Sequence, residues 1–378
     1  MAYFYHLVLY KPFENVVKSR ECVILIRLRS IKMTVKEKDN LMKMRKLCMA
    51  VSMVLGLAAC GAGQEQVSTT IPESSIGASI SSIDTNPFFV DMYNTLRTVG
   101  SENPQIHLQL DSAHDSVEQQ NKQIEDMINN GAKALIVLLV SPKNGAEFAA
   151  KMCNRRIPVV YVYRSPGAKA LQECDIAYYA GPDDRQAGIL QAGLVLEGWQ
   201  EHSEWDKNGD GKMQVAVLEG TVGVPSSKQR SDWVISSLKF HPEGGLGADS
   251  VDIVFRETGK YDTTYAKEVT EKWLKSPDFD KVEVIISGGD SMSMGVVEVL
   301  EQNNKKLPIY SINGMADTIE AVKRGRIEAT IINDQDTFMR AAVRMAANLT
   351  NDRPATEGIY ADMDEGGSVL IPLKRLDK

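Results

Sequence analysis

Apolar residues recur along most of the chain with two periods, one typical of strands and one typical of helices. In the segment Phe88–Val99 they return every three or four positions, which predicts a helix. Ile106, Leu108 and Leu110 alternate with polar residues, as in a strand that buries one face. The run Ala134–Val140 is continuously apolar, which is typical of a strand covered by helices on both faces.

The same patterns repeat to near the end of the chain. Further strands are predicted at Ile76–Ile80, Ile157–Tyr163, Ala177–Ala180, Met213–Leu218, Val251–Phe255, Val282–Ser287, Leu307–Ile312 and Ala329–Ile332. Helices are predicted at Val117–Asn129, Gly145–Asn154, Gln186–Gln200, Lys228–Phe240, Thr263–Leu274, Ser291–Gln302, Thr318–Lys323 and Asp336–Leu349. This alternation implies βαβ units and mainly parallel sheets. These strands are too many for one sheet. We therefore expect an α/β protein with two doubly wound lobes and a ligand cleft between them.

Composition agrees with a large globular protein and narrows its function. The chain has 378 residues, of which 43% are hydrophobic and 25% charged, and its length favours two domains or lobes. A net charge of -7, without a basic stripe, argues against a nucleic-acid partner. The five histidines are scattered without zinc-ligand spacing, and G-x-S-x-G, G-x-x-x-x-G-K and G-x-G-x-x-G are absent from the sequence. These absences lower the expectation of an enzyme.

The amino-terminal region predicts an export signal and a lipid anchor. Residues 42–60 begin with a basic segment, continue with an apolar one too short to span a bilayer, and end in Leu-Ala-Ala-Cys60. This end resembles the bacterial lipobox, which implies lipidation of Cys60 and an extracytoplasmic, membrane-anchored protein. The alternative, a buried core helix, fits poorly because residues 61–75 are polar and resemble a flexible tether. Residues 1–41 precede the complete signal, so we interpret them as a misassigned start or a disordered extension.

Two cysteines follow the predicted anchor. Cys153 ends a predicted helix and Cys174 precedes a predicted strand, so both fall at one edge of the sheet. A disulfide is one alternative in an oxidising compartment. Two buried free thiols are the expectation.

The stretch from residue 206 to 214 has the spacing of a calcium loop. Oxygen-bearing groups stand at positions 1, 3, 5, 7 and 9 of an EF-hand pattern, the seventh through its backbone carbonyl: Asp206, Asn208, Asp210, Lys212 and Gln214. Gly211 stands where the loop must turn. Position 12 is Val217, within an apolar strand, so the last carboxylate must come from elsewhere in the chain. The alternative is a solvated Asp/Asn/Gly turn without metal. Calcium is the only cofactor predicted, and its role would be structural.

Several stretches together resemble the periplasmic galactose/glucose-binding proteins of ABC transporters, within the type I periplasmic binding fold. They are NKQIEDMINNGAKAL (121–135), AYYAGPDDRQAGILQAG (177–193), WDKNGDGKMQ (205–214), KVEVIISGGDSMSMGVVEVL (281–300) and the IINDQ around Asn333. The resemblance implies that Glu283, in an apolar strand, completes the calcium site.

The resemblance also implies three crossovers between the lobes, near Tyr161–Arg164, near Asn333 and near Ser368–Ile371. The amino-terminal lobe would then comprise residues 76–162 and 333–368. The carboxyl-terminal lobe, with the calcium loop, would comprise residues 163–332 and 369–378.

By the family pattern, four polar or aromatic residues fall on sugar-contacting positions. Arg230 and Asn333 keep the family's residue type, Tyr261 replaces a stacking Trp, and Asn313 replaces an Asp. Other positions change their chemistry: Leu138, Val224, Ser226 and Gly289 stand where the family has Asn, His, Asp and Asn. Since each unmet hydroxyl pairing costs about 1–3 kcal/mol, these changes argue against glucose or galactose as the tight ligand.

The first predicted strand-to-helix turn adds three candidate contacts. The sequence from Asp84 to Phe89 resembles the N-P-F-F segment of ribose-type binders, which implies that Asn86, Phe88 and Phe89 contact the sugar. The alternative for the two phenylalanines is core packing of a helical turn. Asp84 and Asp290 are the remaining acids of the assigned cleft. The predicted ligand is a monosaccharide. The site is predicted to be retuned to one that is less polar or differently hydroxylated, such as a deoxy sugar or a pentose.

These expectations leave rival functions open. The first is a monomeric substrate-binding lipoprotein that delivers a sugar to the permease of an ABC importer. The second is the same fold used as a sugar sensor for a membrane histidine kinase or chemoreceptor. A carbohydrate enzyme would need two carboxylates at glycosidase separation, and only Asp84 and Asp290 are unassigned. A sugar repressor is disfavoured because a signal peptide stands where its DNA-binding helices would be.

Overall fold

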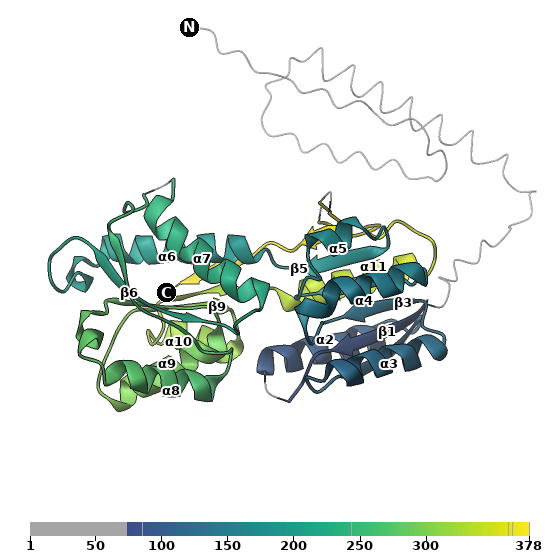
Figure 1. The fold of residues 1–378 in the computed structure, drawn as a ribbon, viewed down its shortest axis with the longest axis horizontal. Helices are drawn as coiled ribbons and strands as arrows, with labels where there is room; N and C mark the ends of the chain where they lie inside the picture. The colour runs from purple at the N-terminus through teal and green to yellow at the C-terminus, as the bar shows by residue number, and fades with distance from the viewer. Residues whose placement is uncertain (1–73, 85, 243, 362, 365, 378) are drawn as a thin grey trace, which may run out of the picture. The chain divides into compact units, whose positions relative to one another are not determined.

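The computed structural model describes residues 74–84, 86–242, 244–361, 363–364 and 366–377. They form two α/β lobes, each built on one twisted sheet with helices packed against it (Figure 1). The predicted signal peptide, Cys60 and tether lie outside the described residues. Within the described ranges, no helix is both long and apolar enough to cross a membrane.

Each lobe contains a six-stranded sheet. The first sheet has the order β11-β5-β4-β3-β1-β2, and every neighbouring pair is parallel. Its strands are β1 (Ser74–Ile80), β2 (Ile106–Ser112), β3 (Ala134–Val137), β4 (Val159–Val162), β5 (Ala177–Gly181) and β11 (Ser368–Leu370). The second has the order β12-β10-β9-β8-β6-β7, in which only β12 is antiparallel, to β10. Its strands are β6 (Met213–Glu219), β7 (Val251–Thr258), β8 (Val284–Ser287), β9 (Ile309–Asn313), β10 (Ala329–Ile332) and β12 (Lys374–Asp377).

Helices connect the parallel strands and cover the sheets. Those of the first lobe are α2 (Pro87–Glu102), α3 (Val117–Asn129), α4 (Gly145–Asn154), α5 (Ala168–Gln172) and α11 (Gln335–Leu349). Those of the second lobe are α6 (Asp184–Glu201), α7 (Pro225–Phe240), α8 (Thr263–Leu274), α9 (Asp290–Gln302) and α10 (Ala316–Lys323). This arrangement confirms the predicted fold class of two doubly wound lobes.

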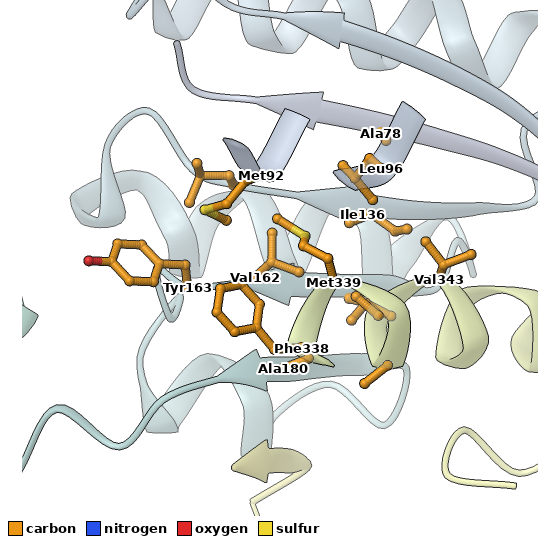
Figure 2. Close-up of a cluster of buried hydrophobic side chains, with 14 of the residues drawn as sticks. Ala78, Met92, Leu96, Ile136, Val162, Tyr163, Ala180, Phe338, Met339 and Val343 are labelled. Atoms are coloured by element: carbon orange, nitrogen blue, oxygen red, sulfur yellow. The ribbon is translucent and has the colours of Figure 1, made fainter. Parts of the chain in front are cut away.

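Helix α11 completes the core of the first lobe although it follows the last parallel strand of the second. Its Met339 and Val343 pack in one cluster with Ile136 of β3 and Val162 of β4 (Figure 2). Helix α11 is amphipathic, with apolar residues on one face. This face must pack against a sheet to be buried. The chain must therefore cross back to the first lobe before residue 335.

Both sheets reverse their winding direction at one point. In the first lobe the reversal lies between β1 and β3, and in the second between β6 and β8. Helices on either side of such a point diverge, and ligands of doubly wound folds bind in the crevice at the carboxyl ends of these strands. The candidate site is expected there.

Two of the predicted crossovers are displaced along the chain. The structure keeps residues 163–181 in the first lobe, because β5 pairs with β4 from Val159↔Ala177 to Val162↔Ala180. The first crossover therefore falls between β5 and α6, and the predicted boundary at residue 163 is wrong. Strand β11 pairs with β5, so the third crossover lies between β11 and β12, next to the predicted Ser368–Ile371, and the lobe boundary falls after Leu370 instead of before Val369. The second crossover lies at residues 333–334, between β10 and α11.

These errors have one physical cause. A short apolar run such as Ala177–Ala180 has the same pattern whether it extends the first sheet or begins the second. Only the pairing partner across the sheet distinguishes the two, and that partner is remote in sequence.

Cys153 and Cys174 form a disulfide, which contradicts the expectation of two free thiols. Their Cα atoms are 5.8 Å apart, within the range that a disulfide spans. The end of α4 and the approach to β5 meet at the same sheet edge, because β5 lies next to β4. The bond closes a loop with a sequence separation of 21 residues within the first lobe.

Replacing both cysteines by serine is expected to lower the free energy of unfolding by about 3 kcal/mol, the loop-closure value for a loop of this length. Urea unfolding with and without reductant measures this difference. Reductant should destabilise the parent protein and leave the double variant unchanged; equal curves for the parent protein in both conditions would contradict the prediction.

Candidate ligand-binding site and metal loop

The candidate site is centred on Arg230 of α7, whose side chain is fully buried. Its Nε donates to Asp184 Oδ1 at 2.7 Å, and one terminal nitrogen donates to the carbonyl of Gly288 and to Asn313 Oδ1, each at 3.1 Å. The other terminal nitrogen donates to the hydroxyl of Tyr163 at 3.2 Å. Asp184, Gly288 and Asn313 belong to the second lobe, whereas Tyr163 follows β4 of the first. The guanidinium therefore joins polar groups of both lobes.

A buried ion pair sets the electrostatics of this centre. Burial raises the pKa of Asp184, and Arg230 opposes that shift. Burial by itself would lower the pKa of Arg230, but Tyr163 and Asp184 together raise it. Arginine does not lose its proton in proteins, so its charge requires an ionised Asp184 beside it.

Two asparagines extend the polar centre along the carboxyl ends of β9 and β10. Asn313 Oδ1 accepts from Arg230 and also from Asn333 Nδ2, the latter at 2.9 Å. Asn333 Oδ1 is buried and has no hydrogen-bond partner among the described residues. Since a buried acceptor without a donor is unfavourable, this oxygen is available to a hydroxyl or amide donor from a ligand.

Aromatic rings pack around Tyr163 at the edge of the first-lobe core. The ring centroid of Tyr163 lies 4.9 Å from that of Phe88, 6.0 Å from Phe89 and 6.3 Å from Phe338. The guanidinium of Arg164 lies over the Phe89 ring at 4.9 Å. Phe88 and Phe89 are buried in the first-lobe core, as the packing alternative predicts.

Tyr261 lies at the winding reversal of the second sheet. A Cβ atom at Gly220 or at Gly289 would run into its ring, so both glycines are needed for the ring to lie there. The Gly289 that stands in place of a family asparagine therefore makes room for an aromatic side chain. Burial raises the pKa of Tyr261 to about 12, so its hydroxyl stays protonated at neutral pH.

The remaining predicted contacts lie apart from Arg230's partners. Asp84 pairs with His114 at 2.6 Å and is half exposed. Asn86 caps α2 by accepting from the amide of Phe88. Asp290 is fully buried, and its oxygens accept from Ser311, Thr330 and the amide of Met315. Burial raises the pKa of Asp290 to about 6, and its hydrogen bonds hold β9, β10 and the start of α10 together.

Two residues of the site were missed by sequence reasoning: Tyr163 and Asp184. The sequence pattern predicts Tyr163 at the end of a strand and Asp184 shortly before a helix. A usable signal was present, because Tyr163 directly follows β4 and Asp184 lies three residues after the end of β5, where the carboxyl ends of the strands face a predicted cleft. A cavity of about 360 Å³ next to them is lined by Tyr163, Asp184 and Ser226, among others.

Glu283 contacts the predicted metal loop through hydrogen bonds from the loop's backbone amides. Glu283 Oε1 accepts from the amide of Lys207 at 2.8 Å, and Oε2 accepts from the amide of Gln214 at 3.0 Å. The carboxylate thus contacts both ends of the loop, although 69 residues separate it from Gln214. Burial raises the pKa of Glu283, the hydrogen bonds from the amides of Gln214 and Lys207 oppose this shift, and the nearby carboxylates of the loop add to it.

The donor set fits a hard cation. Gln214 Oε1 is buried without a hydrogen-bond partner among the described residues, whereas its Nε2 donates to Asp210. Oxygen ligands with several carboxylates are those that calcium prefers. Asp206 and Asp210 accept hydrogen bonds from loop amides, and their carboxylates do not all lie within 4.8 Å of Glu283 and of each other. Asn208 Oδ1 accepts from the amide of Asp210, and the Lys212 carbonyl follows in the same turn.

The chain folds into two doubly wound lobes that are joined by three crossovers. Polar groups of both lobes meet on one buried arginine, which is the architecture of a two-lobed binding protein. The family described as periplasmic binding protein domain matches residues 76–354. The chain belongs to this family.

Individual relatives agree with this assignment. The D-galactose/methyl-galactoside binding periplasmic protein MglB of Haemophilus influenzae is 32% identical over 72% of this chain and 80% of its own. The ribose import binding protein RbsB of the same organism is 27% identical over 85% of this chain and 98% of its own. A solved periplasmic solute-binding protein of Actinobacillus succinogenes with bound D-allose has a TM-score of 0.66 at 21% identity, covering 80% of this chain and 97% of its own. This structural likeness shows the fold.

Replacing Asp184 by Asn is expected to lower the free energy of unfolding by about 3 kcal/mol, because Arg230 would keep a buried charge without its counter-ion. Urea unfolding at neutral pH measures the change. The matched control is Glu102→Gln, which removes the exposed pair with Arg340 and should change stability by less than about 1 kcal/mol. Equal effects of the two substitutions would contradict the importance of burial.

Proposed function

We propose that this protein is the extracytoplasmic solute-binding component of an ABC importer, and that it binds a neutral monosaccharide or related polyol between its lobes. Its family and its relatives, whose names refer to galactosides, ribose and xylitol, support this class of ligand. The observation that carries the proposal is the unpaired, buried Asn333 Oδ1 beside the Arg230 centre.

The chemistry of the site fits hydroxyl groups better than charged ligands. Arg230 is neutralised by Asp184, so it does not demand an anion. Asn333 provides an acceptor, and Asn313 and Arg230 provide a fixed polar surface around it. The ring of Tyr163, which lines the adjoining cavity, offers an apolar surface on which the C–H face of a polyol can pack.

Specificity within this class is proposed to differ from that of galactose or glucose binders. Leu138 is fully buried and Gly289 makes room for Tyr261, so neither supplies the amide that the family pattern has at these positions. Val224 is the residue before α7 and has no polar side chain, and Ser226 is shorter than the acid it replaces. Fewer fixed donors and acceptors favour a less hydroxylated solute.

Replacing Asn333 by Ala is expected to weaken binding of the best-bound polyol at least about 10-fold, because one hydroxyl then loses its acceptor. Isothermal titration of the full chain with a panel of glycerol, xylitol, D-ribose, D-xylose, L-fucose, D-glucose and D-galactose measures it.

Asn348→Ala is the matched control for this substitution. Asn348 is another buried asparagine, whose Nδ2 donates to the carbonyls of Ala355 and Glu357 within the first lobe. It should lower stability and leave affinity unchanged. Absence of binding to every member of the panel would contradict the proposed function.

We further propose that the loop around Asp206 binds calcium as a structural ion. Asp206, Asn208, Asp210, Lys212 through its carbonyl, Gln214 and Glu283 would hold it. When bound, the ion would neutralise the facing carboxylates and stabilise the entry to β6. The buried, unpaired Gln214 Oε1 and the bridging Glu283 support this assignment.

Chelation by EDTA is expected to lower the melting temperature of the calcium-loaded protein by about 5 °C or more, since an ion that binds only the folded chain stabilises it by mass action. Differential scanning calorimetry with added calcium or EDTA measures the shift. In Glu283→Gln the two curves should coincide, whereas Asp278→Asn, at an exposed acid paired with Lys281, should keep the full shift. Insensitivity of the parent protein to EDTA would contradict the calcium site.

The final element of the proposal is a lipid anchor at Cys60, which lies outside the described residues. The lipobox-like sequence and the polar segment that follows it support this location. An anchored binding protein stays close to a permease in the same membrane, which raises its effective concentration there.

A further inference from the structure

Tyr163 occupies an unusual place at the end of β4. Its backbone φ is +60°, in the left-handed region that residues other than Gly, Asn and Asp seldom adopt. Its amide still donates to the carbonyl of Ala180, so the turn is anchored to β5. Figure 2 shows the ring at the edge of the first-lobe core, with the hydroxyl pointing away from the cluster. The backbone turn therefore directs the phenol toward Arg230.

The hydroxyl group of Tyr163, in the first lobe, accepts a hydrogen bond from the guanidinium of Arg230, which belongs to the second lobe. The recorded partners of the Arg230 guanidinium are Asp184, Gly288 and Asn313 in the second lobe and the Tyr163 oxygen in the first. A phenol oxygen accepts a hydrogen bond as the hydroxyl of a polyol does. The chain thus supplies from its own first lobe a group that is chemically equivalent to a solute hydroxyl.

The ring of Tyr163 also takes space. It lies against Phe88 and Phe89 of the first-lobe core and against Phe338 of α11. Only 8% of its surface is exposed, so it fills the space beside those rings. The adjoining cavity, of about 360 Å³, is lined by Arg164, Ser226 and Gln229 together with Tyr163 and Asp184.

We propose that the Tyr163 side chain is an internal occupant of the solute position, which takes a hydrogen bond from Arg230 and fills the volume of a sugar ring, so that the site prefers polyols smaller than a hexopyranose. This inference rests on the proposed function and specifies its ligand class. Pentitols, pentoses and shorter polyols fit beside the tyrosine. A hexopyranose has to displace the phenol and lose its contacts with Arg230 and the phenylalanine rings.

Tyr163→Asn tests the inference with little risk to folding. Asn tolerates a positive φ, retains a polar side chain and removes the ring. Titration calorimetry of the full chain with xylitol, D-ribose and D-galactose should show that the parent protein prefers the two smaller solutes. In the variant the affinity for D-galactose should rise at least about 10-fold relative to that for xylitol, which changes the size preference.

Two further variants separate volume from hydrogen bonding and from general effects. Tyr163→Phe keeps the ring and should keep the preference for small solutes. Tyr161→Phe removes the hydroxyl of a buried tyrosine two residues earlier, which packs in a different cluster of the first lobe, and should leave every affinity unchanged.

The outcomes distinguish this inference from the proposed function. Tighter binding of D-galactose than of xylitol by the parent protein would overturn the inference and the proposed specificity, but it would support the binding of a monosaccharide. An unchanged ratio of the two affinities in Tyr163→Asn would also overturn the inference, whereas the binding itself would still support the proposed function. Absence of binding of all three solutes to the parent protein and to every variant would overturn both.

Discussion

The buried charge of Arg230 is the constraint on which the site depends. An arginine that is removed from water must be matched by a counter-ion and by hydrogen-bond acceptors, because its proton cannot be given up. Asp184 supplies the charge, and Gly288, Asn313 and Tyr163 supply further acceptors. These partners come from the start of α6, the turn after β8, the end of β9 and the residue after β4. Their convergence places the carboxyl ends of strands from both sheets around a single side chain.

The same centre explains why the surrounding positions are small or apolar. Gly220 and Gly289 lie where any side chain would overlap the Tyr261 ring, and Leu138 is enclosed at the end of β3. Small and apolar residues thus surround the polar group formed by Arg230, Asn313 and Asn333. A pocket of this kind discriminates by shape and by a few hydrogen bonds, rather than by a dense hydrogen-bond network.

Each lobe contains its own long-range link outside the site. In the first lobe the disulfide between Cys153 and Cys174 joins the end of α4 to the approach to β5. In the second, Glu283, the residue that precedes β8, accepts hydrogen bonds from both ends of the loop before β6. Both links restrict loops at a sheet edge, and neither spans the two lobes. Movement of one lobe against the other would therefore leave both links intact, since only the crossover segments and contacts such as Arg230–Tyr163 would have to change.

The sequence by itself determined the class of fold, the position of most helices and strands, and the spacing of oxygen-bearing residues in the loop around Asp206, because these depend on local periodicity and spacing. It also placed Arg230, Asn313 and Asn333 in one site through their resemblance to a family pattern. Tertiary structure alone decided that Ala177–Gly181 completes the first sheet, that Cys153 and Cys174 are bonded, and that Tyr163 reaches Arg230. Each of these depends on which segments become neighbours across a sheet or between lobes, and residues far apart in sequence carry no local mark of that proximity.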